Sequence, residues 1–448
     1  MSNVVPISSA SAPLAALQEA FCLLRLAGEL RVGDRREIAD ILAGTRRGDV
    51  SMYRKQDATV LMKRCLETLP FASNTKSVCE DFFVSPSTIE YTEIAFSPCL
   101  TPPSTLNYWV GSKVEPKPGD WSVIREFLRD VICAGNENSY IYLQYFLAHM
   151  LQRPEEKPGV MVVLLGGEGI GKGSLFELLG KIWSQTTLQV SDVDHIVGNF
   201  NAAIERNYVI CMDEAIFSGD RKAADRLKSL ITESTVTIEQ KHQPRRTIQS
   251  HHRFFAASNH QHFSQVGADD RRSFFLRVSE ARKSDFGYWE DVHTAITDPV
   301  IIAAMVHELL NLDLAGFRVR DRPKTTEHME QKLKSLTGFR RYWFEVLVAG
   351  DFDTSPERST QTNWDDACFV GTKTLQKGMR VHQSGTRQFV LPQARVLSHE
   401  LLQICPSSLS ARLQHFGSQE RGYNLPALSA ARAEFEQVLG GKIDWDDV

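Results

Sequence analysis

Val160-Met161-Val162-Val163-Leu164-Leu165 is an uninterrupted apolar run, and the stretch Gly166-Gly167-Glu168-Gly169-Ile170-Gly171-Lys172-Gly173-Ser174 follows it directly. The run predicts a buried β-strand, and the apolar spacing over residues 174–183 predicts a helix after the loop. A glycine-rich loop between a buried strand and a helix start is the context of a phosphate-binding P-loop. Glycines let backbone N–H groups curve around phosphate oxygens, and the helix N-terminus adds partial positive charge. We therefore expect residues 166–174 to bind a nucleotide, with Lys172 on its β- and γ-phosphates.

The position after the lysine departs from the usual P-loop pattern, which places Ser or Thr there to hold magnesium. Gly173 occupies that position and Ser174 comes next. Some nucleotide kinases carry this Gly-Lys-Gly-Thr form, so the departure keeps a nucleotide as the expected ligand. We choose Ser174 as the hydroxyl ligand of Mg²⁺.

A second apolar strand is predicted at Tyr208-Val209-Ile210-Cys211-Met212, and Asp213-Glu214 follows it. A carboxylate at the end of a buried parallel strand can hold magnesium through water, and we assign this role to Asp213. The adjacent Glu214 can polarise the water that attacks the γ-phosphate. The sequence therefore predicts an ATP site with Mg²⁺ between the loop and this strand end.

Composition is that of an ordinary globular protein, with 42% hydrophobic and 24% charged residues in 448. The formal net charge is −4, so any contact with nucleic acid must come from local basic patches. The eight cysteines form no Cys-x-x-Cys pair, which fits a reducing, cytoplasmic location. There is no apolar run of transmembrane length, and we expect no membrane partner.

Outside the two motifs, hydrophobic periodicity and turn residues predict further elements. Helices are expected over residues 14–30, 34–69, 121–133, 138–151, 221–233 and 299–312. Strands are expected over residues 81–84, 89–96, 254–257 and 273–278, and a hairpin over 236–238 and 246–248 with residues 240–244 at its tip. Trp109 and Trp121 are expected to pack in a core rather than to stack on bases.

In chain order the elements are a P-loop strand, an Asp-Glu strand, a lysine-bearing hairpin, a strand ending at Asn259 and an arginine pair. This order resembles the superfamily-3 helicases of viruses and mobile elements, a branch of the AAA+ ATPases. The resemblance implies that Asn259 senses the γ-phosphate and that Arg271 or Arg272 acts as a finger on the neighbouring subunit's nucleotide. It also implies that Lys241-His242 at the hairpin tip grips the backbone of single-stranded DNA.

The wider pattern looks like phage and plasmid primase–helicase proteins, over roughly residues 107–448. It rests on Asn107-Tyr108-Trp109, the two helices expected before the P-loop strand, Gly171-Lys172-Gly173-Ser174, Asp270-Arg271-Arg272 and the terminal Arg421-Gly422-Tyr423-Asn424-Leu425-Pro426. The paired metal-binding acids of a primase-polymerase domain are not identified in the preceding residues, so primase activity is not carried over.

The fold class implied is α/β, with an AAA+ P-loop core on a parallel sheet, a helical region before it and a smaller α+β domain after it. We expect a mostly helical, then mixed, accessory region at 1–106, a helical collar at 107–158, the helicase core at 159–318 and a DNA- or protein-binding accessory domain at 319–448.

The leading hypothesis is an ATP-dependent, ring-forming DNA helicase for replication of a phage, plasmid or other mobile element. Its expected partners are single-stranded or forked DNA, further copies of the chain in a hexameric ring, and a separate primase or initiator protein. A P-loop kinase of nucleotides or small molecules is the first alternative, since Gly-Lys-Gly-Ser suits one. The second is a ring that uses ATP only to assemble or to load another protein.

Overall fold

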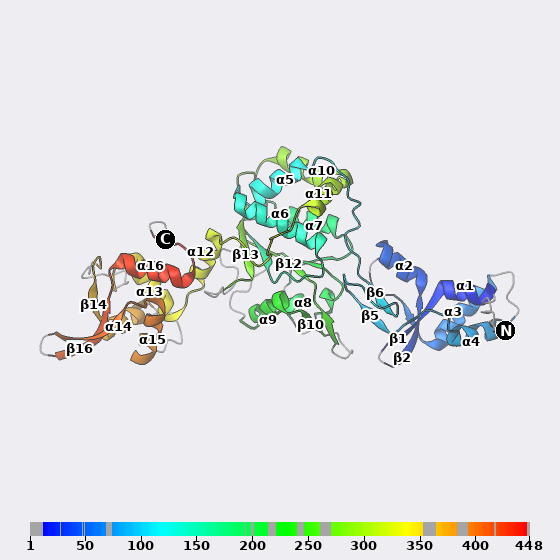
Figure 1. The fold of residues 1–448 in the computed structure, drawn as a ribbon, viewed down its shortest axis with the longest axis horizontal. Helices are drawn as coiled ribbons and strands as arrows, with labels where there is room; N and C mark the ends of the chain where they lie inside the picture. The colour runs from blue at the N-terminus through cyan, green and yellow to red at the C-terminus, as the bar shows by residue number, and fades with distance from the viewer. Residues whose placement is uncertain are drawn as a thin grey trace, which may run out of the picture.

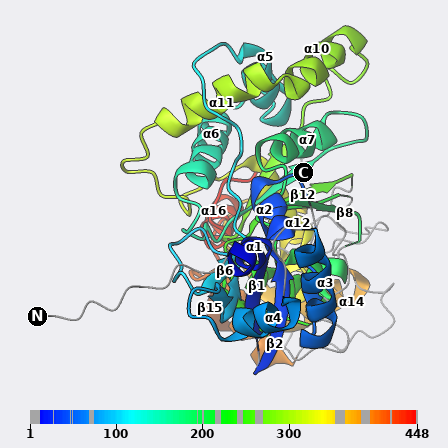
Figure 2. The same ribbon diagram turned by 90° about the vertical axis from the view of Figure 1, so that its right-hand side faces the viewer.

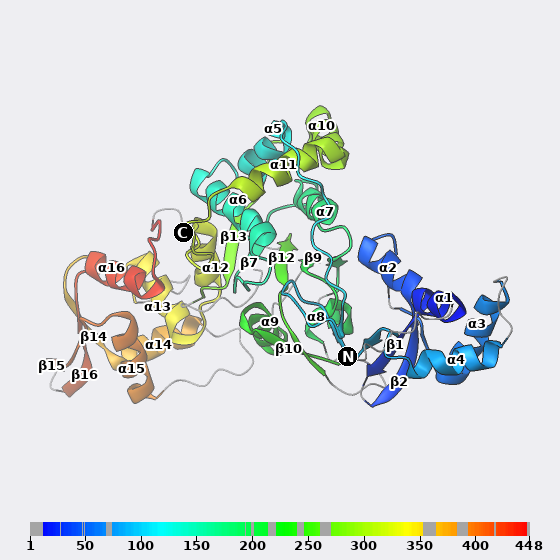
Figure 3. The same ribbon diagram turned by 45° about the vertical axis from the view of Figure 1, so that its right-hand side comes forward.

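The computed structural model shows three parts in a row along the chain's longest axis (Figure 1). It describes residues 12–445 except 27, 47, 49, 69–73, 193, 199–200, 214–220, 240–245, 260–269, 353–363, 383–392 and 416–417. The N-terminal and C-terminal parts lie on opposite sides of the central part in two views of the molecule (Figures 1 and 3).

The central part is built on a five-stranded sheet in the order β13-β7-β12-β9-β8. Its strands are β7 (Met161–Leu165), β8 (Thr187–Val190), β9 (Val209–Met212), β12 (Arg253–Ser258) and β13 (Ser273–Arg277). Every neighbouring pair is parallel, so all carboxyl ends meet at one edge of the sheet. After β7 the chain forms β8 at the far side of the sheet, and β9 and β12 then fill the space between β8 and β7. The last strand, β13, pairs with the other side of β7. The sheet order therefore reverses beside β7, which is where ligands bind in open α/β sheets.

Both faces of this sheet are covered, which explains why its strands read as continuous apolar runs. Val162 and Leu164 face one layer of helices, whereas Val163 and Leu165 face the other. The first layer holds α5 (Ser122–Glu126), the π-helix η1 (Phe127–Ile132), α6 (Glu137–Gln152), α7 (Lys172–Ile182), α10 (Phe286–Thr297) and α11 (Pro299–Asn311). Figure 2 shows these helices gathered on one side of the sheet. The second layer holds α8 (Asp194–Val197), the 3-10 turn η2 (Ala202–Ile204), α9 (Arg221–Thr232) and a hairpin.

The predicted hairpin is present as β10 (Thr235–Ile238) and β11 (Arg246–Gln249), which pair antiparallel. Val236 and Ile238 are buried against the second layer, and Thr235 and Thr237, which alternate with them, are exposed, so this face pattern follows the period of two. The predicted tip, which carries Lys241 and His242, lies outside the described residues.

The N-terminal part departs from the sequence prediction. The helix expected over residues 14–30 is wrong, because α1 (Ala12–Ala20) is followed by the antiparallel strands β1 (Phe21–Leu26) and β2 (Glu29–Asp34). A left-handed Gly28, with φ of 82°, makes the turn between them. The sheet order is β3-β2-β1-β4, completed by β3 (Met52–Tyr53) and β4 (Glu90–Tyr91).

Two further expectations in this part are corrected. The helix expected over 34–69 is divided into α2 (Arg35–Ala43) and α3 (Lys55–Glu67), with β3 between them. The strand expected at 81–84 is the end of helix α4 (Thr75–Val84), whose buried Cys79 and Phe82 pack in the small N-terminal core. The strand expected at 89–96 is confirmed as β4 and β5 (Glu93–Ala95), the latter paired with β6 (Thr105–Asn107).

The C-terminal part has its own hydrophobic core, built around aromatic side chains such as Trp343, Trp364 and Phe435. A three-stranded antiparallel sheet in the order β14-β16-β15 carries it. Its elements are α12 (Thr326–Lys334), α13 (Gly338–Ala349), β14 (Cys368–Gly371), α14 (Thr372–His382), α15 (Ala394–Ile404), β15 (Leu409–His415), β16 (Ser418–Leu425) and α16 (Leu428–Leu439). Tyr423 and Leu425 of the terminal motif are buried in this core, so those two motif positions serve packing.

The two tryptophans expected in a core are confirmed there. Trp109 meets Tyr208 edge-on with ring centroids 5.0 Å apart. Trp121 is 1% exposed, and its indole N–H donates to Glu308 at 2.8 Å. None of the helices in the described ranges is long and apolar enough to cross a membrane.

Candidate nucleotide-binding site

The glycine-rich loop joins the carboxyl end of β7 to the first turn of α7, as the sequence predicts. Gly171 precedes the helix with φ of 99°, in the left-handed region that favours glycine. A Cβ on Gly171 would lie 2.4 Å from the Trp289 ring and 3.1 Å from Phe127. The backbone therefore bends where neither the dihedral angle nor the space admits a side chain.

Lys172 and Asn259 meet at the carboxyl edge of the sheet. The Lys172 ammonium donates to the Asn259 side-chain oxygen at 2.7 Å, to the Gly166 carbonyl at 2.6 Å and to the Gly167 carbonyl. The pairing of β7 with β12 causes this contact, because Leu165 lies opposite Ser258 and the next residues of both strands share one edge. The Asn259 amide also donates to Glu168 at 3.4 Å. The lysine is thus oriented by its own loop and by one neighbouring strand.

Asp213 follows β9, whose neighbour in the sheet is β12, so it lies at the same carboxyl edge as the loop. Its backbone N–H donates to the Val190 carbonyl at 2.8 Å, which fixes its main chain to β8. Its carboxylate accepts from Gln189 at 3.4 Å. Glu214, to which we assign the catalytic water, lies outside the described residues.

The first turn of α7 holds the two residues of the unusual P-loop ending. Ser174 is 9% exposed and belongs to the buried side of the helix. A Cβ on Gly173 would meet no atom within 4 Å, so packing does not demand a glycine there. Hydroxyl and carboxylate oxygens are the hard ligands that Mg²⁺ takes, which Ser174 and Asp213 can offer directly or through water.

The arginine pair lies at the amino ends of the parallel strands, opposite the carboxyl ends that carry the glycine-rich loop. The Met161 N–H, at the start of β7, donates to the Arg272 carbonyl at 2.7 Å. The loop begins after Leu165, so the length of β7, about 13 Å at ~3.3 Å a residue, separates the arginine backbone from the loop. The structure therefore does not bring Arg271 or Arg272 to Lys172 of the same chain.

Other residues beside the loop were not foreseen from the sequence. A Cβ on Gly167 would lie 3.1 Å from the Glu280 carboxylate and 3.7 Å from the Lys283 ammonium. Both follow β13, and the Val278 N–H ties this segment to the Leu165 carbonyl at 2.9 Å. No local motif marks Glu280 and Lys283, because only the pairing of β13 with β7 places them here.

Asn201 is a further residue to which the sequence analysis gave no role. It is 8% exposed; its amide donates to the Thr237 carbonyl at 3.0 Å, and its side-chain oxygen accepts from the Glu239 N–H at 2.9 Å. These two bonds hold the outgoing strand of the hairpin at the last described residue before the tip.

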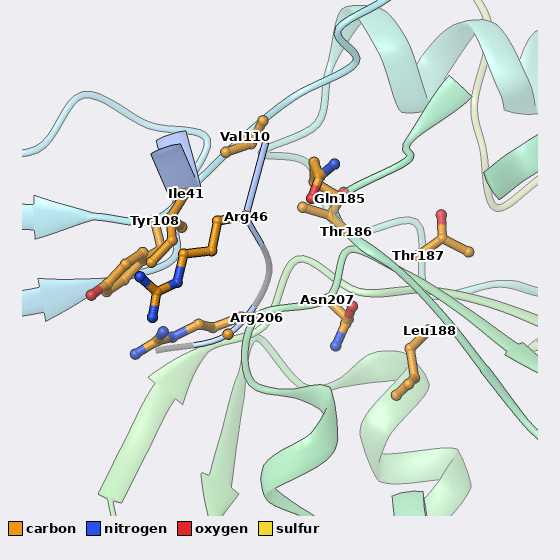
Figure 4. A pocket seen from close by; sticks show the side chains of 11 residues that line it. Ile41, Arg46, Tyr108, Val110, Gln185, Thr186, Thr187, Leu188, Arg206 and Asn207 are labelled. Atoms are coloured by element: carbon orange, nitrogen blue, oxygen red, sulfur yellow. The ribbon is translucent and has the colours of Figure 1, made fainter. Parts of the chain in front are cut away.

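A cavity of about 340 Å³ lies where the N-terminal part meets the central sheet (Figure 4). Arg206 lies over the Tyr108 ring, 3.8 Å from its centroid, and Arg46 pairs with Glu37 at 2.6 Å. The Gln185 amide donates to the Gly44 carbonyl at 2.5 Å across the same seam. The Arg206–Tyr108 contact and the Gln185–Gly44 bond join the two parts, whereas Arg46 and Glu37 both belong to the N-terminal part.

Proteins of known structure share the fold of this chain at low sequence identity. Residues 164–272 match a family of unknown function, DUF5906, and no curated protein matches the sequence. A structure of the NrS-1 C-terminal region superposes with a TM-score of 0.65 at 14% identity, covering 92% of this chain and 98% of that one. A second structure of that region, residues 305–718, gives 0.64 at 14% identity, with 93% and 100% covered. A JCV helicase structure is 15% identical over 52% of this chain and 65% of that one, and its TM-score of 0.28 is too low to support a shared fold.

Proposed function

We propose that this chain is a P-loop ATPase that hydrolyses ATP at the carboxyl edge of its central sheet. The observation that carries the proposal is the contact of Lys172 with Asn259 beside the glycine-rich loop. A cation at the loop and an amide on the adjacent strand both face the place where a γ-phosphate would lie. Electrostatic stabilisation by such positioned groups is the main catalytic effect in phosphoryl transfer.

In this proposal the loop N–H groups and Lys172 hold the phosphates, while Ser174 and Asp213 hold Mg²⁺. A magnesium ion held by these oxygens would offset charge on the phosphates. Asn259 and Glu214 orient the attacking water, and Glu214 polarises it. Lys283, beside Gly167 of the loop, would place a second positive charge near the phosphates.

We extend the proposal to a ring-forming helicase of the AAA+ superfamily-3 type, hexameric, for a phage, plasmid or other mobile element. The position of Arg271 and Arg272 at the edge opposite Lys172 supports a finger that acts on a neighbouring chain. Such a contact is head-to-tail, and head-to-tail contacts close into rings when the rotation per subunit allows it. The projecting hairpin, held by Asn201, would carry Lys241 and His242 to single-stranded or forked DNA, with a separate primase or initiator as a further partner.

The test is ATP hydrolysis by the full chain with and without single-stranded DNA, for the parent and Lys172→Ala. Lys181→Ala is the matched control, because Lys181 is on the same helix and forms a weak ion pair with Glu177 at 4.0 Å. We expect Lys172→Ala to lose hydrolysis by about 100-fold or more, with Lys181→Ala unchanged. Phosphate transfer to a small acceptor in place of water would favour the kinase, and DNA-independent assembly without turnover would favour the loading ring.

A further inference from the structure

A cavity of about 620 Å³ lies between the central sheet and the C-terminal part. Its walls come from the loop before β13, the segment before and within α12, and the end of α16. Six of its lining residues are cations, against the single carboxylate of Asp270: Arg271, Arg320, Arg322, Lys324, Lys332 and Lys442. In a chain with a net charge of −4, this is a concentrated local field of the opposite sign.

Asp270 is already engaged by the protein around it. Its carboxylate accepts from the backbone N–H groups of Arg272 at 3.4 Å and Ser273 at 3.2 Å, and lies 3.4 Å from the His328 ring nitrogen. Burial acts to raise the Asp270 pKa, but His328 and Arg322 more than offset it, so the pKa lies below its usual value. Asp270 therefore serves the loop that carries it, and Glu436, which lies outside the lining, pairs with Lys442 at 2.9 Å, so the six cations still outnumber the two carboxylates that these contacts supply.

Arg322 is the clearest case of this imbalance. Its side chain is only 6% exposed, and its nearest carboxylate oxygen, on Asp270, is 3.8 Å away. One guanidinium nitrogen donates to the Asp270 backbone carbonyl at 2.7 Å, whereas the buried Nε has no hydrogen-bond partner among the described residues. Burial lowers the pKa of Arg322, which records the cost of holding the charge here. An anion in the cavity would relieve that cost.

The two lysines on the α16 side meet carbonyl groups. Lys332 is 7% exposed and donates to the Leu439 carbonyl at 2.7 Å, and Lys324 donates to the Gly440 carbonyl at 2.9 Å. Carbonyls at a helix C-terminus carry partial negative charge, and they orient both ammonium groups here. The cavity thus has a buried cationic floor and an exposed cationic rim formed by Arg320, Lys324 and Lys442.

We propose that this cavity binds the phosphate backbone of a nucleic-acid strand. Among the described residues its lining has no Phe, Tyr or Trp side chain, and the one ring they contribute, His328, is stacked on Phe275 with centroids 5.8 Å apart. The site can therefore hold phosphates but offers no platform for a base, which suits sequence-independent backbone contact better than a whole nucleotide. The choice of ligand rests on the proposed strand-handling function.

The test uses the double variant Arg320→Gln/Lys324→Gln in the full chain, with a fluorescent oligo-dT strand as the probe. Neither residue belongs to the candidate ATP site. Lys373→Gln/Lys377→Gln is the control, because both lysines are exposed on α14 away from the cavity. Two lost phosphate contacts should lower the slope of log affinity against log salt by about 1.4. The control should keep the parent slope, and ATP hydrolysis without DNA should be unchanged in both variants.

Strand affinity and salt slope equal to the parent's would overturn the proposal. So would a loss of ATP affinity with strand binding intact, because a nucleotide would then be the ligand of the cavity. A parent that hydrolyses ATP but binds no strand would overturn this inference alone and leave the ATPase standing. If the double variant does not fold, Arg320→Gln alone replaces it, since that side chain is exposed at the rim, and the slope should then fall by about 0.7.

Discussion

Replacing Gly171 with alanine should damage the loop through two effects that can be separated. The residue has φ of 99°, and the new Cβ would lie 2.4 Å from the Trp289 ring. A left-handed backbone costs an L-residue about 1–2 kcal/mol. Forcing a methyl group into a packed site costs about 1–3 kcal/mol. The sum predicts a loss of about 2–5 kcal/mol in the stability of the central part, if the two effects add.

The neighbouring Gly173 is the matched control, because it lies inside the first turn of α7 with no atom within 4 Å of a built Cβ. Alanine there should stabilise the helix by about 0.5–1 kcal/mol, so glycine-to-alanine changes two residues apart should have opposite signs. Urea denaturation followed by tryptophan emission measures both, with the transition of the central part compared between variants.

A third variant separates the two costs. Gly171→Ala with Trp289→Leu removes the ring from the path of the methyl group but keeps the backbone strain. The double variant should lose less stability than the sum of the losses in Trp289→Leu and Gly171→Ala, because the clash between the methyl group and the ring is absent from it. Equal stability of Gly171→Ala and Gly173→Ala would refute the argument, since local geometry would then have no bearing on the loop.

Three other predictions concern Lys157, the arginine pair and the hairpin tip. Burial lowers the pKa of Lys157 from 10.5 to about 7, so between pH 7 and 10.5 the unfolded chain binds more protons and the free energy of unfolding should rise with pH. Lys157→Met should remove this rise. A difference in urea midpoint between parent and variant that does not change with pH would contradict the argument. Arg271→Ala or Arg272→Ala should lose ATP turnover but keep nucleotide binding, and mixing with Lys172→Ala should restore some turnover through composite sites; no recovery in verified mixed oligomers argues against a finger in trans. Alanine at both positions of Lys241–His242 should leave basal ATP hydrolysis near normal and weaken single-strand binding and forked-duplex unwinding; parent-like unwinding would exclude the tip as the grip on DNA.

Four strands of the central sheet could be predicted because they are buried on both faces and bounded by turn residues, whereas β8 was missed because only Val190 of its four residues is buried. The N-terminal part could not, for a physical reason. Phe21-Cys22-Leu23-Leu24 is a short apolar run, and periodicity alone does not distinguish a buried strand from a helix. Gly28 held the available clue, because a glycine between two short runs permits the two-residue turn of a hairpin. In α4, Phe82-Phe83-Val84 favoured a strand, but the Asn74 side chain caps a helix by accepting from the Ser77 N–H at 3.3 Å.

The candidate site shows the same limit at a larger scale. The loop could be found locally, but its contact with Asn259 joins residues 87 apart and depends on β7 lying beside β12. Strand order is set by packing of the whole sheet, so the residue types alone do not give it. Glu280 and Lys283 were missed for this reason. The cationic cavity was missed likewise, because its walls come from three distant segments, although the net charge did imply that basic patches must be local.

The residues proposed for the ATP site and the arginine pair lie at opposite ends of the parallel strands of the central sheet. Parallel strands place Lys172, Asn259 and Asp213 at the carboxyl edge, while the residues before β13 lie at the amino edge. A phosphate role for an arginine at the amino edge therefore needs a second copy stacked head-to-tail. Arg271 lines the cationic cavity and Arg272 does not. If a strand occupies that cavity, Arg271 contributes to strand binding, and Arg272 is the arginine left for the neighbour's nucleotide. The mixing experiment then distinguishes the two, because only the finger variant should be rescued in turnover by Lys172→Ala.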